Sequence, residues 1–133
     1  MPGAEGVRDE SQWTLRRAVE SAAEARAAAR SFLDGSVGRR PEEAILLVVT
    51  ELVSNAVQHG KEPIELRLSM ATSAVRIEVD DAEPRPAIMR RPGDRETSGR
   101  GLVIVDRLGR WGCAPREGDG KTVWCEVDVE SPA

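Results

Sequence analysis

Three residues whose side chains could bind a ligand or transfer a proton recur every four positions in the middle of this chain: Glu51, Asn55 and His59. On a helix, this spacing puts a carboxylate, a carboxamide and an imidazole one turn apart along a single edge. Such a row can converge on one ligand lying beside the helix. The same residue types are also typical of the solvated margin of an amphipathic helix, and spacing alone favours that simpler interpretation.

A helix must position these side chains, and the surrounding sequence predicts one. Pro41 is tolerated in a first helical turn, and Glu42 and Glu43 complement the positive end of the helix dipole. Gly60 follows as a cap, so we expect the helix to run from Pro41 to His59. Its buried face is a broad apolar stripe with helical spacing, formed by Ile45, Val48, Val49, Leu52, Val53 and Ala56.

Two further elements are expected before this helix. Residues 11–16 alternate polar and apolar side chains and predict a short first strand. Residues 18–33 are rich in Ala, Glu and Arg, carry apolar residues on one face and are followed by Asp34 and Gly35. This composition and its stop signal predict a first helix.

Two hairpins are expected after it. Apolar and polar residues alternate over residues 63–70 and 74–80, and again over residues 110–116 and 121–129. A period of two is the spacing of a strand with one buried face. The short polar stretches between the members of each pair are typical of turns.

A proline-rich, charged loop and a short helix separate the hairpins. Residues 81–98 have the composition of a loop, and a loop of this length is often functional. Gly99-Arg100-Gly101 then opens a helix over residues 102–108. Helices that alternate with hairpins predict an α+β fold, a two-layer α/β sandwich whose mixed, mostly antiparallel sheet carries three helices on one face.

Composition limits the class of protein. The chain has 133 residues, of which 40% are hydrophobic and 32% charged, the balance of one globular domain with its own core. Its apolar runs are too short to span a bilayer, so we expect no membrane association. A net charge of -4 gives no general attraction to nucleic acid.

The N-terminal residues and the cysteines carry no sign of export or of a metal site. Residues 1–10 lack the basic and apolar regions of a signal peptide, so we expect a disordered tail, a domain over residues 11–129 and a cytoplasmic location. Cys113 and Cys125 form no CxxC unit, and His59 is the only histidine. We therefore expect reduced, packed cysteines and no zinc site.

The sequence contains partial matches to familiar motifs, but the neighbouring residues exclude each of them. Gly120-Lys121-Thr122 has the ending of a Walker A loop, but Pro115 stands where that motif needs glycine, and a strand follows instead of a helix. The run from Gly99 lacks the third glycine of a dinucleotide fingerprint, because Ile104 occupies its place. No serine lies in a Gly-x-Ser-x-Gly elbow.

Four separated pieces nevertheless match one pattern in order. They are Glu51-x-x-x-Asn55, Asp81, Gly99-x-Gly101 and Gly118-x-Gly120-x-Thr122. These pieces resemble the N, G1, G2 and G3 boxes of the Bergerat-fold (GHKL) superfamily of ATPases and kinases. Glu-Leu-Val-Ser-Asn-Ala-Val-Gln-His-Gly and the ending Gly-Lys-Thr-Val-Trp look most like the anti-sigma-factor serine-protein kinases of high-GC bacteria.

The resemblance implies ATP and Mg²⁺ as cofactors and gives the residues of the central helix separate roles. Asn55 would ligate Mg²⁺, because a neutral carboxamide adds no repulsion toward the triphosphate. Glu51 would be the catalytic base that takes the proton from a partner serine. His59 is expected to pack near the helix end.

The other boxes would hold the nucleotide. Asp81 resembles the carboxylate that accepts a hydrogen bond from the adenine amino group, and Thr122 the residue that bridges to that carboxylate through water. The remaining implied nucleotide contacts are Gly99, Arg100, Gly101, Leu102 and Gly120. Glycines there let backbone amides approach the phosphates at a helix N-terminus.

The G1 box departs from the usual Asp-x-Gly, because Glu83 stands in place of the glycine. Two functions therefore stay open. The first is an ATP-dependent serine kinase and anti-sigma factor, with a sigma factor and an anti-anti-sigma (STAS) protein as partners and a homodimer as a possible state. The second is a binding module of the same fold with a degenerate ATP site. A detached histidine-kinase domain fits less well, because no helix pair bearing a phosphoacceptor histidine is present.

Overall fold

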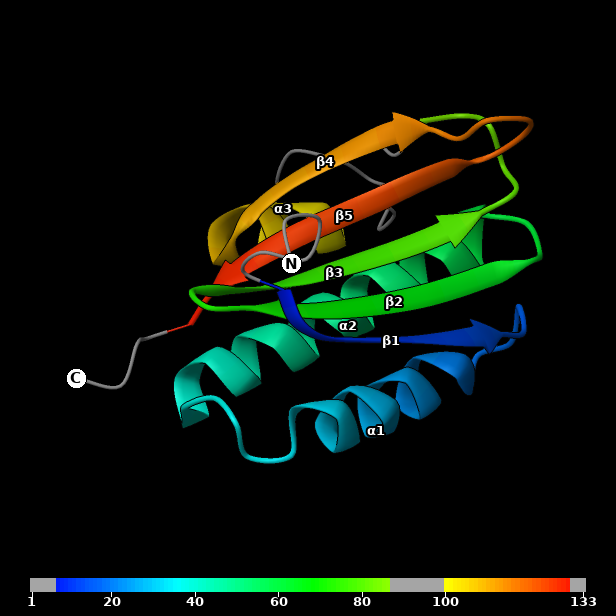
Figure 1. Ribbon diagram of the computed structural model, residues 1–133. Coiled ribbons are helices and arrows are strands. Elements are labelled where there is room, and N and C mark those ends of the chain that lie inside the picture. Colours follow the sequence, from blue (N-terminus) through cyan, green and yellow to red (C-terminus); the bar gives the residue numbers. More distant parts are fainter. Residues whose placement is uncertain (1–6, 87–99, 130–133) are drawn as a thin grey trace.

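A computed structural model of the chain describes residues 7–86 and 100–129 and arranges them in two layers, a sheet and a set of helices (Figure 1). In chain order the elements are β1 (Val7–Leu15), α1 (Ser21–Leu33), α2 (Arg39–His59), β2 (Ile64–Ala71), β3 (Ala74–Asp81), α3 (Arg100–Leu108), β4 (Arg110–Pro115) and β5 (Lys121–Asp128). This is the predicted order and the predicted α+β class.

The five strands of the described residues lie in the order β1-β2-β3-β5-β4, and every neighbouring pair is antiparallel. The sheet is therefore wholly antiparallel rather than mixed. The reason lies in the connection through α3. After β3 the chain passes through α3 to β4, and β5 then turns back and lies between β3 and β4. The parallel strands β3 and β4 are therefore separated by β5, which is antiparallel to both.

The core lies between the sheet and α2. All three helices cover the same face of the sheet, with α2 behind the central strands (Figure 1). The predicted apolar stripe of α2 is buried along its whole length, and alternate residues of β2, β3 and β5 are buried against it. Within residues 7–86 and 100–129, no helix has the length and apolar character needed to cross a membrane.

The start of β1 differs from the sequence-based expectation. β1 begins at Val7, so residues 7–10, which were expected in a disordered tail, belong to the sheet. Pairing with β2 explains this, because Val7 lies opposite Ala71 at the end of β2, and the partner strand supplies backbone hydrogen bonds that local sequence does not reveal. Residues 1–6 lie outside the described part of the chain.

The cysteines lie on the last two strands and are not bonded to each other. Cys113 is half-buried and Cys125 fully buried, and both are free thiols. Burial raises the pKa of Cys125 to about 11, so this thiol stays protonated at neutral pH. Both agree with the expectation of reduced packing residues.

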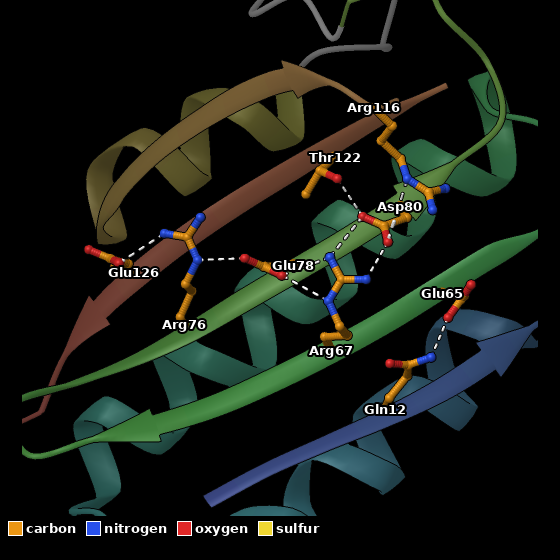
Figure 2. Close-up of polar contacts among 9 residues, drawn as sticks. All are labelled: Gln12, Glu65, Arg67, Arg76, Glu78, Asp80, Arg116, Thr122 and Glu126. Atoms are coloured by element: carbon orange, nitrogen blue, oxygen red, sulfur yellow. Dashed lines mark hydrogen bonds and ion pairs between the residues drawn. The ribbon is translucent and has the colours of Figure 1, made fainter. Parts of the chain in front are cut away.

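The face of the sheet away from the helices carries a row of alternating charges (Figure 2). Arg67 pairs with both Glu78 and Asp80, and Arg76 bridges Glu78 and Glu126. Each side chain contacts partners on neighbouring strands, so the row ties β2, β3 and β5 together. We call this row the open-face network.

Candidate functional site

The central helix presents two polar side chains at the border of the core. Glu51 and Asn55 are half-buried, one turn apart, while the neighbouring Leu52 and Val53 are buried. Burial disfavours the charged form of Glu51 and raises its pKa. A carboxylate with increased proton affinity is suited to accept a proton.

His59 does not join this pair. It is the last residue of α2 and is exposed, so the prediction that it packs at the helix end is wrong. The chain turns away at Gly60, whose backbone N–H donates to the carbonyl of Ala56 at 2.8 Å. The row of three polar residues is thus reduced to Glu51 and Asn55.

The end of α2 meets the end of β3 at Gly60 and Asp81. A Cβ atom added to Gly60 would lie 2.7 Å from Cγ of Asp81, so only glycine fits against that carboxylate. The backbone N–H of Ala82 donates to the carbonyl of Lys61 at 2.8 Å and locks the two ends together. The fold therefore packs the end of α2, a few residues after the first sequence box, against Asp81 of the second box.

Asp81 is 1% exposed and its carboxylate is already bound within the chain. Lys121 Nζ lies 3.2 Å from Asp81 Oδ2 and 3.3 Å from Oδ1. The backbone N–H of Glu83 also donates to Asp81 Oδ1 at 2.7 Å. Lys121 was not among the residues predicted for the site, although its alternation with Val123 and Cys125 places it toward the helices.

Thr122 does not reach Asp81, contrary to the position that the resemblance implied. In the register of β3 and β5, Asp81 lies opposite Lys121 and Asp80 lies opposite Thr122. Successive side chains of a strand point to opposite faces, so Thr122 joins the open-face network. Its Oγ1 donates to Asp80 Oδ1 at 2.5 Å, as Figure 2 shows.

Glu83, the residue that departs from the G1 pattern, lies beside Asp81 and is 5% exposed. Its carboxylate accepts hydrogen bonds from the backbone N–H and the Nε of Arg85 at 3.0 and 3.1 Å. Lys61 Nζ lies 3.6 Å away from it. These contacts, those of Arg85 first, hold the pKa of Glu83 at about 2, so a second carboxylate stays ionised beside Asp81.

The third box lies at the start of α3. Gly99 and the side chain of Arg100 are outside the described part of the chain, and Gly101 is the second residue of the helix. The side chain of Leu102 is fully buried in the core, which leaves its backbone N–H as the group available to a ligand. The first N–H groups of a helix have no partner within it and suit phosphate oxygens.

Gly120 supports the approach of β5 to β3. Its φ is 107°, a left-handed value that favours glycine, and an added Cβ would collide with the backbone oxygen of Asp81. Its place in the site is therefore to let Lys121 and Asp81 come together. Any nucleotide contact would come from its backbone.

The donor set allows a magnesium ion only together with a ligand's own oxygens. Among residues 7–86 and 100–129, no group of three or more His, Cys, Asp or Glu could hold a metal. Mg²⁺ commonly takes one or two protein oxygens and completes its shell with phosphate and water. The carboxamide of Asn55 fits that pattern, so the α2 edge suits Mg-ATP even though Asp81 is already paired.

The family of the chain follows from a match along most of its length. Residues 14–125 match the model of the histidine kinase-like ATPase domain. The chain belongs to this family. The four boxes named from the sequence fall within the matched residues, which agrees with the Bergerat-fold assignment.

Known proteins similar to this chain include an uncharacterized protein of Streptomyces coelicolor, SCO4941. It is 36% identical over a 90-residue alignment, and the match covers 63% of this chain and 85% of that protein. The crystal structure of the RsbU and RsbW domains of Rv1364c from Mycobacterium tuberculosis superposes with a TM-score of 0.69 at 21% identity. That match covers 95% of this chain and 34% of the other, so the chain spans about a third of its length, and the likeness shows the fold.

Proposed function

We propose that this protein is an ATP-dependent protein-serine kinase with a regulatory role, of the anti-sigma-factor type. The observation that carries the proposal is the pair on α2. Glu51 is half-buried with a raised pKa, and Asn55 lies one turn further along the same edge. The family match supports an ATPase or kinase-like domain around that pair.

In this proposal the two residues have different tasks. Asn55 holds Mg²⁺ against the triphosphate, and Glu51 accepts the proton of the serine hydroxyl that becomes phosphorylated. ATP supplies the phosphoryl group, while the N-terminus of α3 provides backbone donors for its phosphates. A STAS-type anti-anti-sigma protein would present the serine, and a sigma factor would be the partner whose availability is controlled.

The first test is whether the folded protein binds Mg-ATP. A ligand that binds only the folded state, at 100 times its dissociation constant, stabilises it by about 2.7 kcal/mol. For a domain of this size the melting temperature should rise by roughly 6 to 15 °C. GTP should have a smaller effect, because it presents a carbonyl to Asp81 where ATP presents an amino group. Equal shifts with both nucleotides would contradict the role of Asp81.

A binding module that acts by protein contacts without ATP turnover is the second candidate. The specific observation in its favour is the ion pair between Asp81 and Lys121, beside the buried carboxylate of Glu83. Binding of a cognate partner with no melting shift at millimolar Mg-ATP would favour this candidate.

A further inference from the structure

Both lysines of the chain contact carboxylates at or just after the end of β3. The sequence contains only Lys61 and Lys121 among its 19 basic residues, the others being arginines. Lys121 pairs with Asp81, and Lys61 lies 3.6 Å from Glu83. The open-face network, by contrast, is built with arginine. Lysine, which has a flexible stem and a compact charge, therefore occurs in this chain only beside the carboxylates next to the candidate site.

The contact between Lys121 and Asp81 is enclosed and saturated. Their side chains are 8% and 2% exposed. The ammonium group of Lys121 has three N–H donors, and it faces both oxygens of Asp81 and the carbonyl of Glu83, which is 3.1 Å away. Within the described residues, every buried side-chain nitrogen or oxygen has a hydrogen-bond partner. Among the described residues, no buried side-chain polar atom at this contact therefore lacks a partner that a ligand could replace.

We infer that Lys121 is an internal competitor for Asp81, and that a purine amino group can reach this carboxylate only when Lys121 leaves it. The inference rests on the proposed function, because it concerns the same nucleotide site. An amino group is a neutral donor, whereas Lys121 contributes a full charge at the same oxygens. A buried ammonium that loses its carboxylate is strongly disfavoured, so the nucleotide must also drive Lys121 toward solvent.

The position of Lys121 makes such a release possible. Lys121 is the first residue of β5, next to Gly120, and its unbranched stem has several rotatable bonds. The release lowers the affinity for the nucleotide, because breaking the ion pair opposes binding. Lys121 thereby sets the affinity of the site for adenine.

Two substitutions test this competition. Lys121→Met keeps the length of the stem and removes the charge, and Lys121→Gln keeps a neutral donor for Asp81 so that the carboxylate is not left bare. We expect both to bind Mg-ATP at least about tenfold more tightly than wild type in calorimetric titration. The matched control is Lys61→Met, which removes the other lysine and should change the affinity less than about twofold.

The results separate this inference from the proposed function. If wild type binds Mg-ATP and both Lys121 variants bind it equally or more weakly, the competition is wrong while the proposed function stands. If neither wild type nor a folded Lys121 variant binds, Asp81 is not the adenine carboxylate, and both are wrong. Melting curves without nucleotide establish that each variant is folded.

A measurement on the wild-type protein covers the case in which the variants fail to fold. Selective ¹³C labelling of lysine gives one Cε signal for each of the two lysines. Under conditions where calorimetry shows saturation with Mg-ATP, the Lys121 signal should move toward the position of a solvated lysine, while Lys61 serves as the internal reference. An unchanged Lys121 signal at saturation would overturn the inference.

Discussion

Glu51 and Asp81, the two carboxylates assigned to the proposed ATP site, have opposite surroundings. Glu51 lies at the edge of the core, where burial raises its pKa. Asp81 is almost fully enclosed and faces the ammonium group of Lys121. A group with increased proton affinity suits proton transfer, whereas a buried carboxylate held in place by its neighbours suits recognition of a hydrogen-bond donor. The proposed roles of the two residues agree with these environments.

Substitutions on α2 should separate catalysis from binding. Glu51→Gln should leave ATP affinity almost unchanged and slow phosphoryl transfer by about 10²- to 10⁴-fold, because the base contacts the serine and not the nucleotide. Asn55→Ala should instead weaken Mg-ATP binding. Serine phosphorylation of a cognate STAS protein and nucleotide affinity are measured in parallel. Transfer by Glu51→Gln at the wild-type rate would exclude Glu51 as the base.

At the scale of elements, β5 has two different faces. Lys121 points toward the helices and the candidate site, while Thr122 points to the open-face network. Within that network Asp80 is nearly buried and accepts hydrogen bonds from Arg67 and Thr122. Its burial on a face without helices results from the long side chains that cover it, including Arg116, whose Nε lies 3.9 Å away.

Removal of Asp80 should therefore destabilise the sheet. Asp80→Ala leaves Arg67 and Thr122 without their shared acceptor, and we expect a loss of about 1 to 3 kcal/mol in the free energy of unfolding. The matched control is Asp128→Ala, because Asp128 also pairs with an arginine but is 73% exposed. That variant should lose less than about 1 kcal/mol. Urea denaturation measures both, and equal losses would contradict a special role for Asp80.

In the molecule as a whole, three elements end or begin at one junction, next to the candidate site. The end of α2, the end of β3 and the start of β5 meet at Gly60, Asp81 and Lys121. The segment after β3 adds Glu83, whose low pKa makes the junction sensitive to acid. Both lysines and two carboxylates therefore control the charge of this one region.

The low pKa of Glu83 predicts a pH dependence of stability. Its folded pKa of about 2 lies below the ordinary value of 4.5, so the folded state holds the ionised form. The resulting stabilisation is present above pH 4.5 and is lost as the pH falls toward 2. Glu83→Gln should remove it, so the stability difference from wild type should shrink over that window. A difference that stays constant with pH would contradict the assignment.

The helices and strands and the family could be predicted from local patterns in the chain. The apolar stripe of α2 and the alternation in β2, β3 and β5 are local patterns, because a helix and a strand impose fixed periods on whichever face is buried. Glu51 and Asn55 belong to one such pattern, so their shared edge could be predicted. The four boxes followed from residue types in order, and the family match covers them.

Which side chains meet at the end of β3 could not be predicted in this way, because it depends on how the strands pair. Register is a relation between strands, and a shift of one residue exchanges the two faces, which is why Thr122 could be assigned to Asp81 when Lys121 holds that place. The length of β1 likewise depends on its partner β2. The burial of Glu83 and the antiparallel pairing around β5 arise from segments distant in sequence, and no local period encodes such contacts.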